Sequence, residues 1–148
     1  MRFLRKLLRD NTGLMAVESA IAIPILVLMA LGSFQVSMLV ARQAELQAAA
    51  AEAEQIALAA KPDTSAKLAT LKSVLRTSTG LGSSDVSVAF RYRCGTDTDL
   101  DDDEGECGSD HEWTFVRIRL SDTFEPFWTS FGIGSDVPLR VVRTVQIS

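Results

Sequence analysis

The sequence predicts an α+β protein: a long N-terminal transmembrane helix extended outside the membrane, then a small domain with a second helix and a three-stranded antiparallel sheet. Three observations predict this fold class. The segment from Ser19 to Ala41 has no charged residue, residues 42–60 are rich in alanine and lack glycine and proline, and three later runs alternate apolar with polar residues. The expected parts are a basic leader peptide (1–13), the transmembrane helix with its extension (14–60) and an extracytoplasmic domain (61–148).

The leader has a net positive charge, whereas the rest of the chain has a net negative charge. The 148-residue chain has a net charge of −4, and removal of the leader takes away four basic residues and one acidic residue, so the remainder would carry −7. We therefore expect no nucleic-acid partner, because no basic stripe would remain to neutralise phosphates. The charged leader residues are Arg2, Arg5, Lys6, Arg9 and Asp10.

The charge-free segment is long enough to cross a bilayer. As a helix, Ser19–Ala41 would extend roughly 35 Å, which exceeds the thickness of the hydrocarbon core. The segment also has more residues than the apolar region of an ordinary cleavable signal peptide. The basic flank precedes it, whereas Arg42 is followed by Glu45, Glu52 and Glu54. By the positive-inside bias, the N-terminus is expected to stay in the cytoplasm and the later domain to be translocated. The lipid bilayer is thus an expected partner.

Glu18 stands at the cytoplasmic edge of this segment, where an ionised carboxylate needs a partner. If the chain were cut after Gly13, the new α-amino group of Leu14 would lie about one helical turn away and could pair with Glu18 within or between chains. Alternatively, Glu18 only ends the span and reaches into the headgroups.

The run from Gly13 through Glu18 to Pro24, GLMAVESAIAIP, resembles the N-terminus of the TadE/TadF-like pseudopilins and, more broadly, of Flp-type (type IVb) prepilins. In that group an aspartyl prepilin peptidase cuts after the glycine, and glutamate is the fifth mature residue. Major pilins carry an aromatic residue after it and are much shorter, whereas this chain has Ser19 and a further domain. The resemblance is therefore to the pseudopilins.

The resemblance implies a minor pilin or pseudopilin that takes part in assembly of a Tad adhesive pilus. It also implies cleavage between Gly13 and Leu14 by prepilin peptidase and charge pairing by Glu18. The implied partners are other pilins and inner-membrane assembly proteins. The alternative is a signal-anchored envelope protein that binds an extracytoplasmic ligand and never polymerises.

Beyond the span, alanine and glutamine favour continued helix to Ala60, with a thin apolar stripe that packs on the chain's own domain or on neighbouring subunits. Lys61-Pro62 ends this helix. Asp63, Thr64 or Ser65 can cap a second helix, which Gly80 and Gly82 stop. The stripe is Leu39, Leu46, Ala53 and Ile56, and the second helix repeats Leu68, Leu71 and Leu75 on one face.

Three alternating runs predict the strands. Their apolar faces are Val86, Val88, Phe90 and Tyr92; Thr114, Val116, Ile118 and Leu120; and Leu139, Val141, Val145 and Ile147, the last interrupted by Arg143. Between the second and third runs, Phe124, Phe127, Trp128 and Phe131 predict a short helix or wide loop with an aromatic face. This face is either a lid on the core or a docking patch, and exposure of Trp128 separates the two.

An acidic loop (95–106) lies between two cysteines. In an extracytoplasmic segment, Cys94 and Cys107 are expected to form one disulfide, two free thiols being the alternative. Asp97, Asp99 and Asp101 resemble the start of an EF-hand calcium loop, but Asp102 replaces its glycine and Gly108 its glutamate. We expect a solvated loop and no cofactor. His111 stands alone, and no nucleophile elbow or phosphate-binding loop occurs, so we expect no enzymatic activity.

Overall fold

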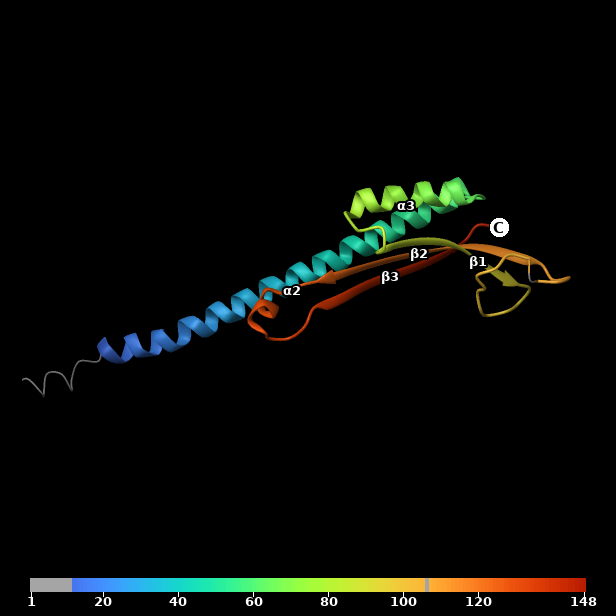
Figure 1. The fold of residues 1–148 in the computed structure, drawn as a ribbon. Coiled ribbons are helices and arrows are strands. Elements are labelled where there is room, and N and C mark those ends of the chain that lie inside the picture. The colour runs from blue at the N-terminus through green and yellow to red at the C-terminus, as the bar shows by residue number, and fades with distance from the viewer. Residues whose placement is uncertain (1–11, 106) are drawn as a thin grey trace, which may run out of the picture. The chain divides into compact units, whose positions relative to one another are not determined.

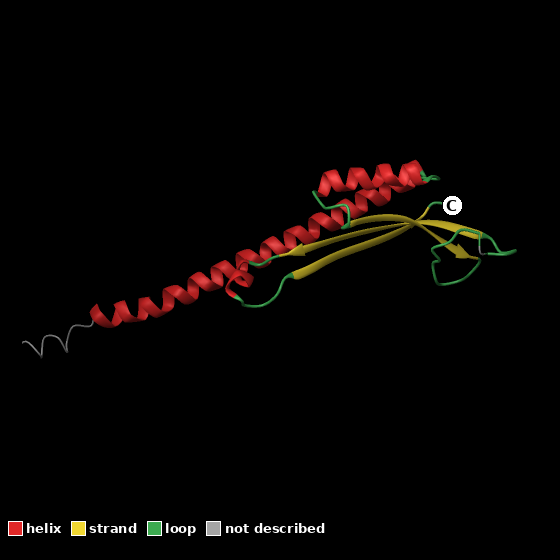
Figure 2. Cartoon of the chain, viewed as in Figure 1, coloured by secondary structure: helices red, strands yellow, loops and turns green. Residues whose placement is uncertain are grey.

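A computed structural model describes residues 12–105 and 107–148, and side chains from residue 17 onward (Figure 1). In chain order the elements are helix α2 (Thr12–Ala60), helix α3 (Ser65–Thr79), strand β1 (Val86–Cys94), strand β2 (Glu112–Phe124), the 3₁₀ helix η1 (Phe127–Phe131) and strand β3 (Val137–Gln146). Figure 2 separates these helices and strands by colour. The order is that of an α+β fold, which confirms the predicted class.

Helix α2 runs without interruption through Pro24 and ends where the sequence predicts. Lys61 donates its backbone N–H to the Ala57 carbonyl at 3.0 Å but adopts a positive φ of 41°, and Pro62 has no N–H to continue the ladder. The chain divides into two compact units, the first ending at Leu39 and the second comprising Val40–Ser148. The part of α2 from Val40 to Ala60 therefore belongs to the same unit as the sheet.

Helix α3 has the predicted caps. Thr64 is its N-cap, with the hydroxyl oxygen accepting from the Lys67 backbone N–H, and Gly80 ends it in the left-handed region at φ 71°, where a side chain would be strained. Leu68, Leu71 and Leu75 are buried, as their spacing predicts. Figure 1 shows α3 along the part of α2 that follows Val40.

The sheet is antiparallel in the order β1-β2-β3. In its register, Val86 pairs with Leu120 and Val116 pairs with Val145, so the apolar residues of the three predicted runs share one face. Strand β2 is longer than its predicted run, because β3 pairs with it as far as Phe124 opposite Val137.

This apolar face and the two helices enclose the core of the second unit. The α2 stripe was predicted in part correctly: Leu46 and Ala53 are buried, but Ile56 is 38% exposed. Ala50 and Ala57 are buried instead of Ile56, because the buried positions follow steps of three and four residues from Leu46 through Ala53. The fully buried side chains elsewhere include Val86, Val116, Ile118 and Leu120.

Candidate functional site

The apolar part of α2 is exposed in the isolated chain. Ile21, Leu28 and Phe34 are each more than 60% exposed, and the most apolar stretch of this helix contains no buried residue. In the described part of the chain, α2 alone is long and apolar enough to cross a membrane. Such a surface is stable only against lipid or against other apolar helices.

Two hydroxyl groups in this stretch are satisfied within the helix. Ser33 donates to the Met29 carbonyl at 2.9 Å, and Ser37 donates to the Ser33 carbonyl at 3.0 Å. Gly32, next to Ser33, has open space where a side chain would begin. The helix surface around Ser33 is therefore compatible with hydrocarbon and leaves room for close approach of another helix.

The predicted processing site falls within the first turn of α2. The backbone of Gly13 and Leu14 is helical, and Glu18 follows one turn later with an exposed side chain. Residues 1–11 of the predicted leader lie outside the described residues, as does the side chain of Leu14. The cut after Gly13 and the charge pairing of Glu18 therefore stay predictions.

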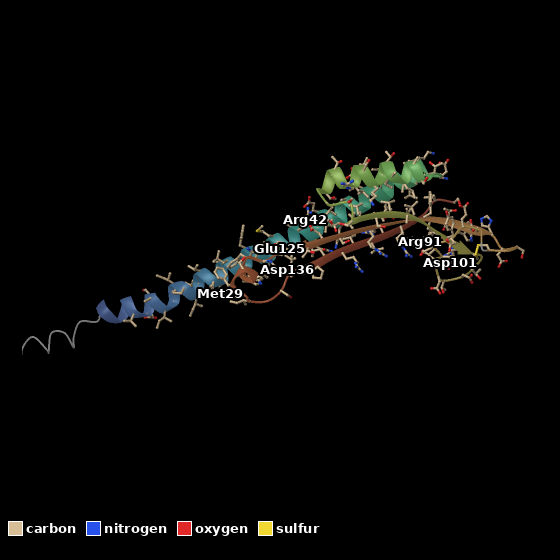
Figure 3. The ribbon with its side chains drawn as sticks, viewed as in Figure 1. Met29, Arg42, Arg91, Asp101, Glu125 and Asp136 are labelled. Carbon is tan, nitrogen blue, oxygen red and sulfur yellow. A yellow bond between two sulfur atoms is a disulfide. The ribbon has the colours of Figure 1, made fainter. Side chains whose placement is uncertain are left out.

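Arg42, the first charged residue after the span, joins three elements of the second unit (Figure 3). Its guanidinium donates to Asp122 on β2 at 2.6 Å, to Glu45 at 2.8 Å and to the carbonyl of Thr79, at the end of α3, at 3.3 Å. The hydrogen bond to Asp122 is the main cause that raises the pKa of Arg42, so the guanidinium stays charged. Neither the residue nor this role was predicted from the sequence.

Residues 13–54 match the family described as TadE-like protein. The match begins at the predicted processing glycine, contains the exposed apolar stretch and Arg42, and ends within the part of α2 that packs on the domain. The chain carries a TadE-like segment. No curated protein and no solved structure matches the chain.

The TadE-like family is a pilus-associated family and not an enzyme family, so the match indicates a Tad pilus-associated protein. Together with the exposed apolar helix, it also indicates membrane anchoring. The match does not extend to α3 or the sheet.

The acidic loop is tethered at both ends. Cys94 and Cys107 form a disulfide with their Cα atoms 5.0 Å apart, which closes the loop as the sequence predicts. Within it, the backbone of Asp101 exchanges two hydrogen bonds with Tyr92, at 2.8 and 3.0 Å, so the loop pairs along the edge of β1. The loop thereby covers part of an edge strand.

This backbone pairing occupies the middle of the stretch that resembled a calcium loop. Among the described residues, Asp97, Asp99 and Asp101 form no cluster that could hold a metal ion, and Glu106 lies outside the described residues. Asp102 instead forms an ion pair with Arg91 of the sheet, which Figure 3 labels next to Asp101 of the same loop. A carboxylate of the loop thus neutralises a positive charge of the domain's own sheet.

The outer face of the sheet carries a group of arginines that the sequence analysis overlooked. Cross-strand register places them on the face opposite the core, and we call this the arginine face. Burial, together with the like charges of Arg117 and Arg119, lowers the pKa of Arg91, and Arg93 stacks 5.1 Å from the Phe115 ring centroid. The arginine face consists of Arg91, Arg93, Arg117, Arg119 and Arg140.

The expectation that no basic stripe remains without the leader is therefore wrong for this face. Each strand contributes only one or two arginines, separated by apolar residues, and antiparallel pairing brings them together. A charge count along the chain does not detect such a surface, although the i, i+2 spacing of Arg91 with Arg93 and of Arg117 with Arg119 is a signal for it.

The aromatic segment forms the predicted short helix, η1. No residue of η1 is buried, and Phe131 is 74% exposed. Phe127 contacts Trp128 and Phe131 edge to face, with ring centroids 5.5 and 6.3 Å away. Trp128, whose exposure was to separate a lid from a docking patch, is half-buried, so both interpretations stay predictions.

Proposed function

We propose that this protein is a minor pilin or pseudopilin that takes part in assembly of a Tad (Flp, type IVb) adhesive pilus. The proposal is carried by one observation: the TadE-like match begins at Gly13 and spans the exposed apolar helix. We infer that prepilin peptidase removes residues 1–13, leaving helix 14–60 and the domain 61–148. The protein is held in the bacterial inner membrane by a single span, with the N-terminus in the cytoplasm and the domain in the periplasm.

The exposed apolar helix supports the assembly mechanism. Its side chains have equally apolar surroundings in lipid and among the helices of neighbouring pilins, so transfer between the two leaves little change in the free energy of hydration. The Leu14 amine and the Glu18 carboxylate are the charged groups of this segment, and their pairing offsets the cost of moving each of them. The domain then caps, primes or anchors the fibre.

Mass spectrometry of the mature N-terminus tests the processing step. The expected product begins at Leu14. A Gly13→Leu variant serves as the control, because a bulky side chain at the cut should leave the chain unprocessed. An intact Met1 in the unmodified protein, or a cut beyond Ala41, would overturn the proposal.

A Glu18→Ala variant tests the charge pairing. We expect the variant to be cleaved and inserted normally but to fail to support piliation, while Glu18→Asp, which keeps the carboxylate, retains partial function. Glu52→Ala is the matched control, since Glu52 is an exposed residue of the same helix outside the span. Normal piliation by Glu18→Ala would reduce Glu18 to a residue of the membrane edge.

Crosslinking to the major pilin in purified fibres tests the partner. Residues on the exposed face of α2 are the attachment points, and a crosslink in fibres places this subunit in the pilus. Crosslinks found only in membranes support a scaffold that remains behind.

The arginine face favours a second candidate function. Five arginines outside the TadE-like segment suit an anionic extracytoplasmic ligand, as a signal-anchored envelope protein that never polymerises would need. The N-terminal analysis separates the two functions, because such a protein would keep its leader.

A further inference from the structure

We propose that the loop between β2 and β3, residues 125–136, contacts the lipid bilayer through its aromatic segment. The inference rests on membrane anchoring by residues 19–41 and does not require polymerisation into a pilus. It concerns the segment Phe127–Gly134, which we call the aromatic loop, and it commits to a lipid surface as the partner.

The direction of β2 places this loop at the membrane end of the domain. Helix α2 leaves the charge-free span at Arg42 and ends at Ala60. At its far end, Pro62 lines a cleft of about 670 Å³ together with Thr114, near the start of β2. Near the end of β2, Asp122 bonds Arg42 at 2.6 Å. Strand β2 therefore runs back along α2, and the loop that follows it begins near Arg42, the first residue after the span.

The loop presents apolar side chains to its surroundings. Phe131 is 74% exposed and Ile133 is 64% exposed. Trp128 is held between the Phe127 ring and Gly134, where an added Cβ would lie 3.3 Å from the indole nitrogen. The clustered rings thus form a preformed apolar tip, and solvent exposure of such a tip is unfavourable unless a partner covers it.

The composition of the loop fits a bilayer interface. Tryptophan favours the headgroup region, where its ring meets hydrocarbon and its N–H meets water, and phenylalanine favours the adjoining acyl boundary. Phe127–Gly134 contains no charged residue, and the two acidic residues, Glu125 and Asp136, lie at the loop's ends (Figure 3). With no basic residue to attract anionic headgroups, the contact is apolar and should form on zwitterionic phosphatidylcholine.

Depth-dependent quenching of tryptophan fluorescence in the full-length protein tests this contact. The chain has two tryptophans at opposite ends of β2: Trp128 follows its end, and Trp113 lies near its start, donating to the Gly95 carbonyl at 3.2 Å. A Trp113→Phe variant reports on Trp128 alone, and a Trp128→Phe variant is the matched control. Both are reconstituted in phosphatidylcholine bilayers with bromine on the upper acyl chain, after circular dichroism has verified equal secondary structure.

We expect brominated lipid to reduce Trp128 emission and not Trp113 emission, and Trp128 emission to be blue-shifted relative to the protein in detergent. Adding Phe131→Ser and Ile133→Ser to the Trp113→Phe variant should diminish the quenching. Equal quenching of the two tryptophans, or quenching of Trp128 by aqueous acrylamide alone, would overturn the proposal. Protection of Trp128 that grows with protein density without lipid quenching would assign the loop to a second copy of the chain instead.

Discussion

Replacement of Arg42 by methionine should lower the free energy of unfolding of the domain by about 2 kcal/mol. The methionine keeps much of the apolar stem but removes the donors to Asp122, Glu45 and Thr79. Arg42 and Asp122 come from elements 80 positions apart, so their pairing helps to hold the end of β2 against α2.

The magnitude follows from partial burial. Side-chain exposure is 27% for Arg42 and 24% for Asp122, against 54% for Glu45. Hydrogen bonds to charged groups contribute about 1.5–3 kcal/mol when shielded, and exposed ion pairs about 0.2–1 kcal/mol. Most of the expected loss therefore comes from Asp122. For a domain of this size, 2 kcal/mol corresponds to a decrease in Tm of about 10 °C.

A double-mutant cycle in the full-length protein measures the coupling directly. Arg42→Met, Asp122→Asn and the double variant are unfolded thermally in detergent, with near-ultraviolet circular dichroism as the signal. We expect a coupling free energy of about 1–2 kcal/mol. The same cycle on Asp63 and Lys67, an exposed ion pair one turn apart, is the control and should give a smaller coupling. Equal coupling in the two cycles would refute the reasoning.

Three further predictions concern the domain. Ala50→Leu should destabilise it by about 1–3 kcal/mol through overpacking, whereas Ala48→Leu on the exposed side of α2 should change stability by less than about 0.5 kcal/mol, both measured by urea unfolding. The cysteines of the Cys94–Cys107 disulfide are 13 positions apart, so its reduction should lower the free energy of unfolding by about 3 kcal/mol. The loss should appear as a lower denaturation midpoint in the presence of reductant. An unchanged midpoint would mean that the disulfide does not restrict the conformations of the unfolded chain. The hydrogen bond from Lys67 lowers the pKa of Asp63 in the folded protein. The stability that the Asp63 carboxylate adds to α3 is therefore present above the pKa of the unfolded chain and is lost as pH falls through the lower folded pKa. Asp63→Asn should remove this acid dependence of Tm.

The helices and strands could be predicted because their signals are local. Thr64 and Gly80 bound α3 where the sequence places its caps, and alternation of apolar residues identifies all three strands. The α2 stripe was harder, because the buried positions are mostly alanines and alanine is frequent on every side of this helix. Only packing against α3 and the sheet distinguishes Ala50 from Ala48.

The surfaces of the domain depend on pairings that the sequence does not encode locally. The arginine face exists because register aligns β1, β2 and β3, and the acidic loop meets Arg91 because Asp101 pairs with the edge of β1. For the aromatic segment, the sequence left a lid and a docking patch as alternatives, since aromatic residues are usually buried in small domains but also form contact surfaces. The helices already cover the inner face, so Phe131 remains outside.

By itself, the sequence determined the fold class, the apolar stretch with the basic residues before it, and the TadE-like pattern from Gly13 through Glu18, because charge, hydropathy and short motifs are properties of neighbouring residues. The tertiary structure alone decided that Arg42 holds Asp122, that five arginines share one face, and that Phe131 of the aromatic loop stays exposed. The first feature follows from the return of β2 along α2 and the second from the register of the three strands, and both join residues far apart in the chain.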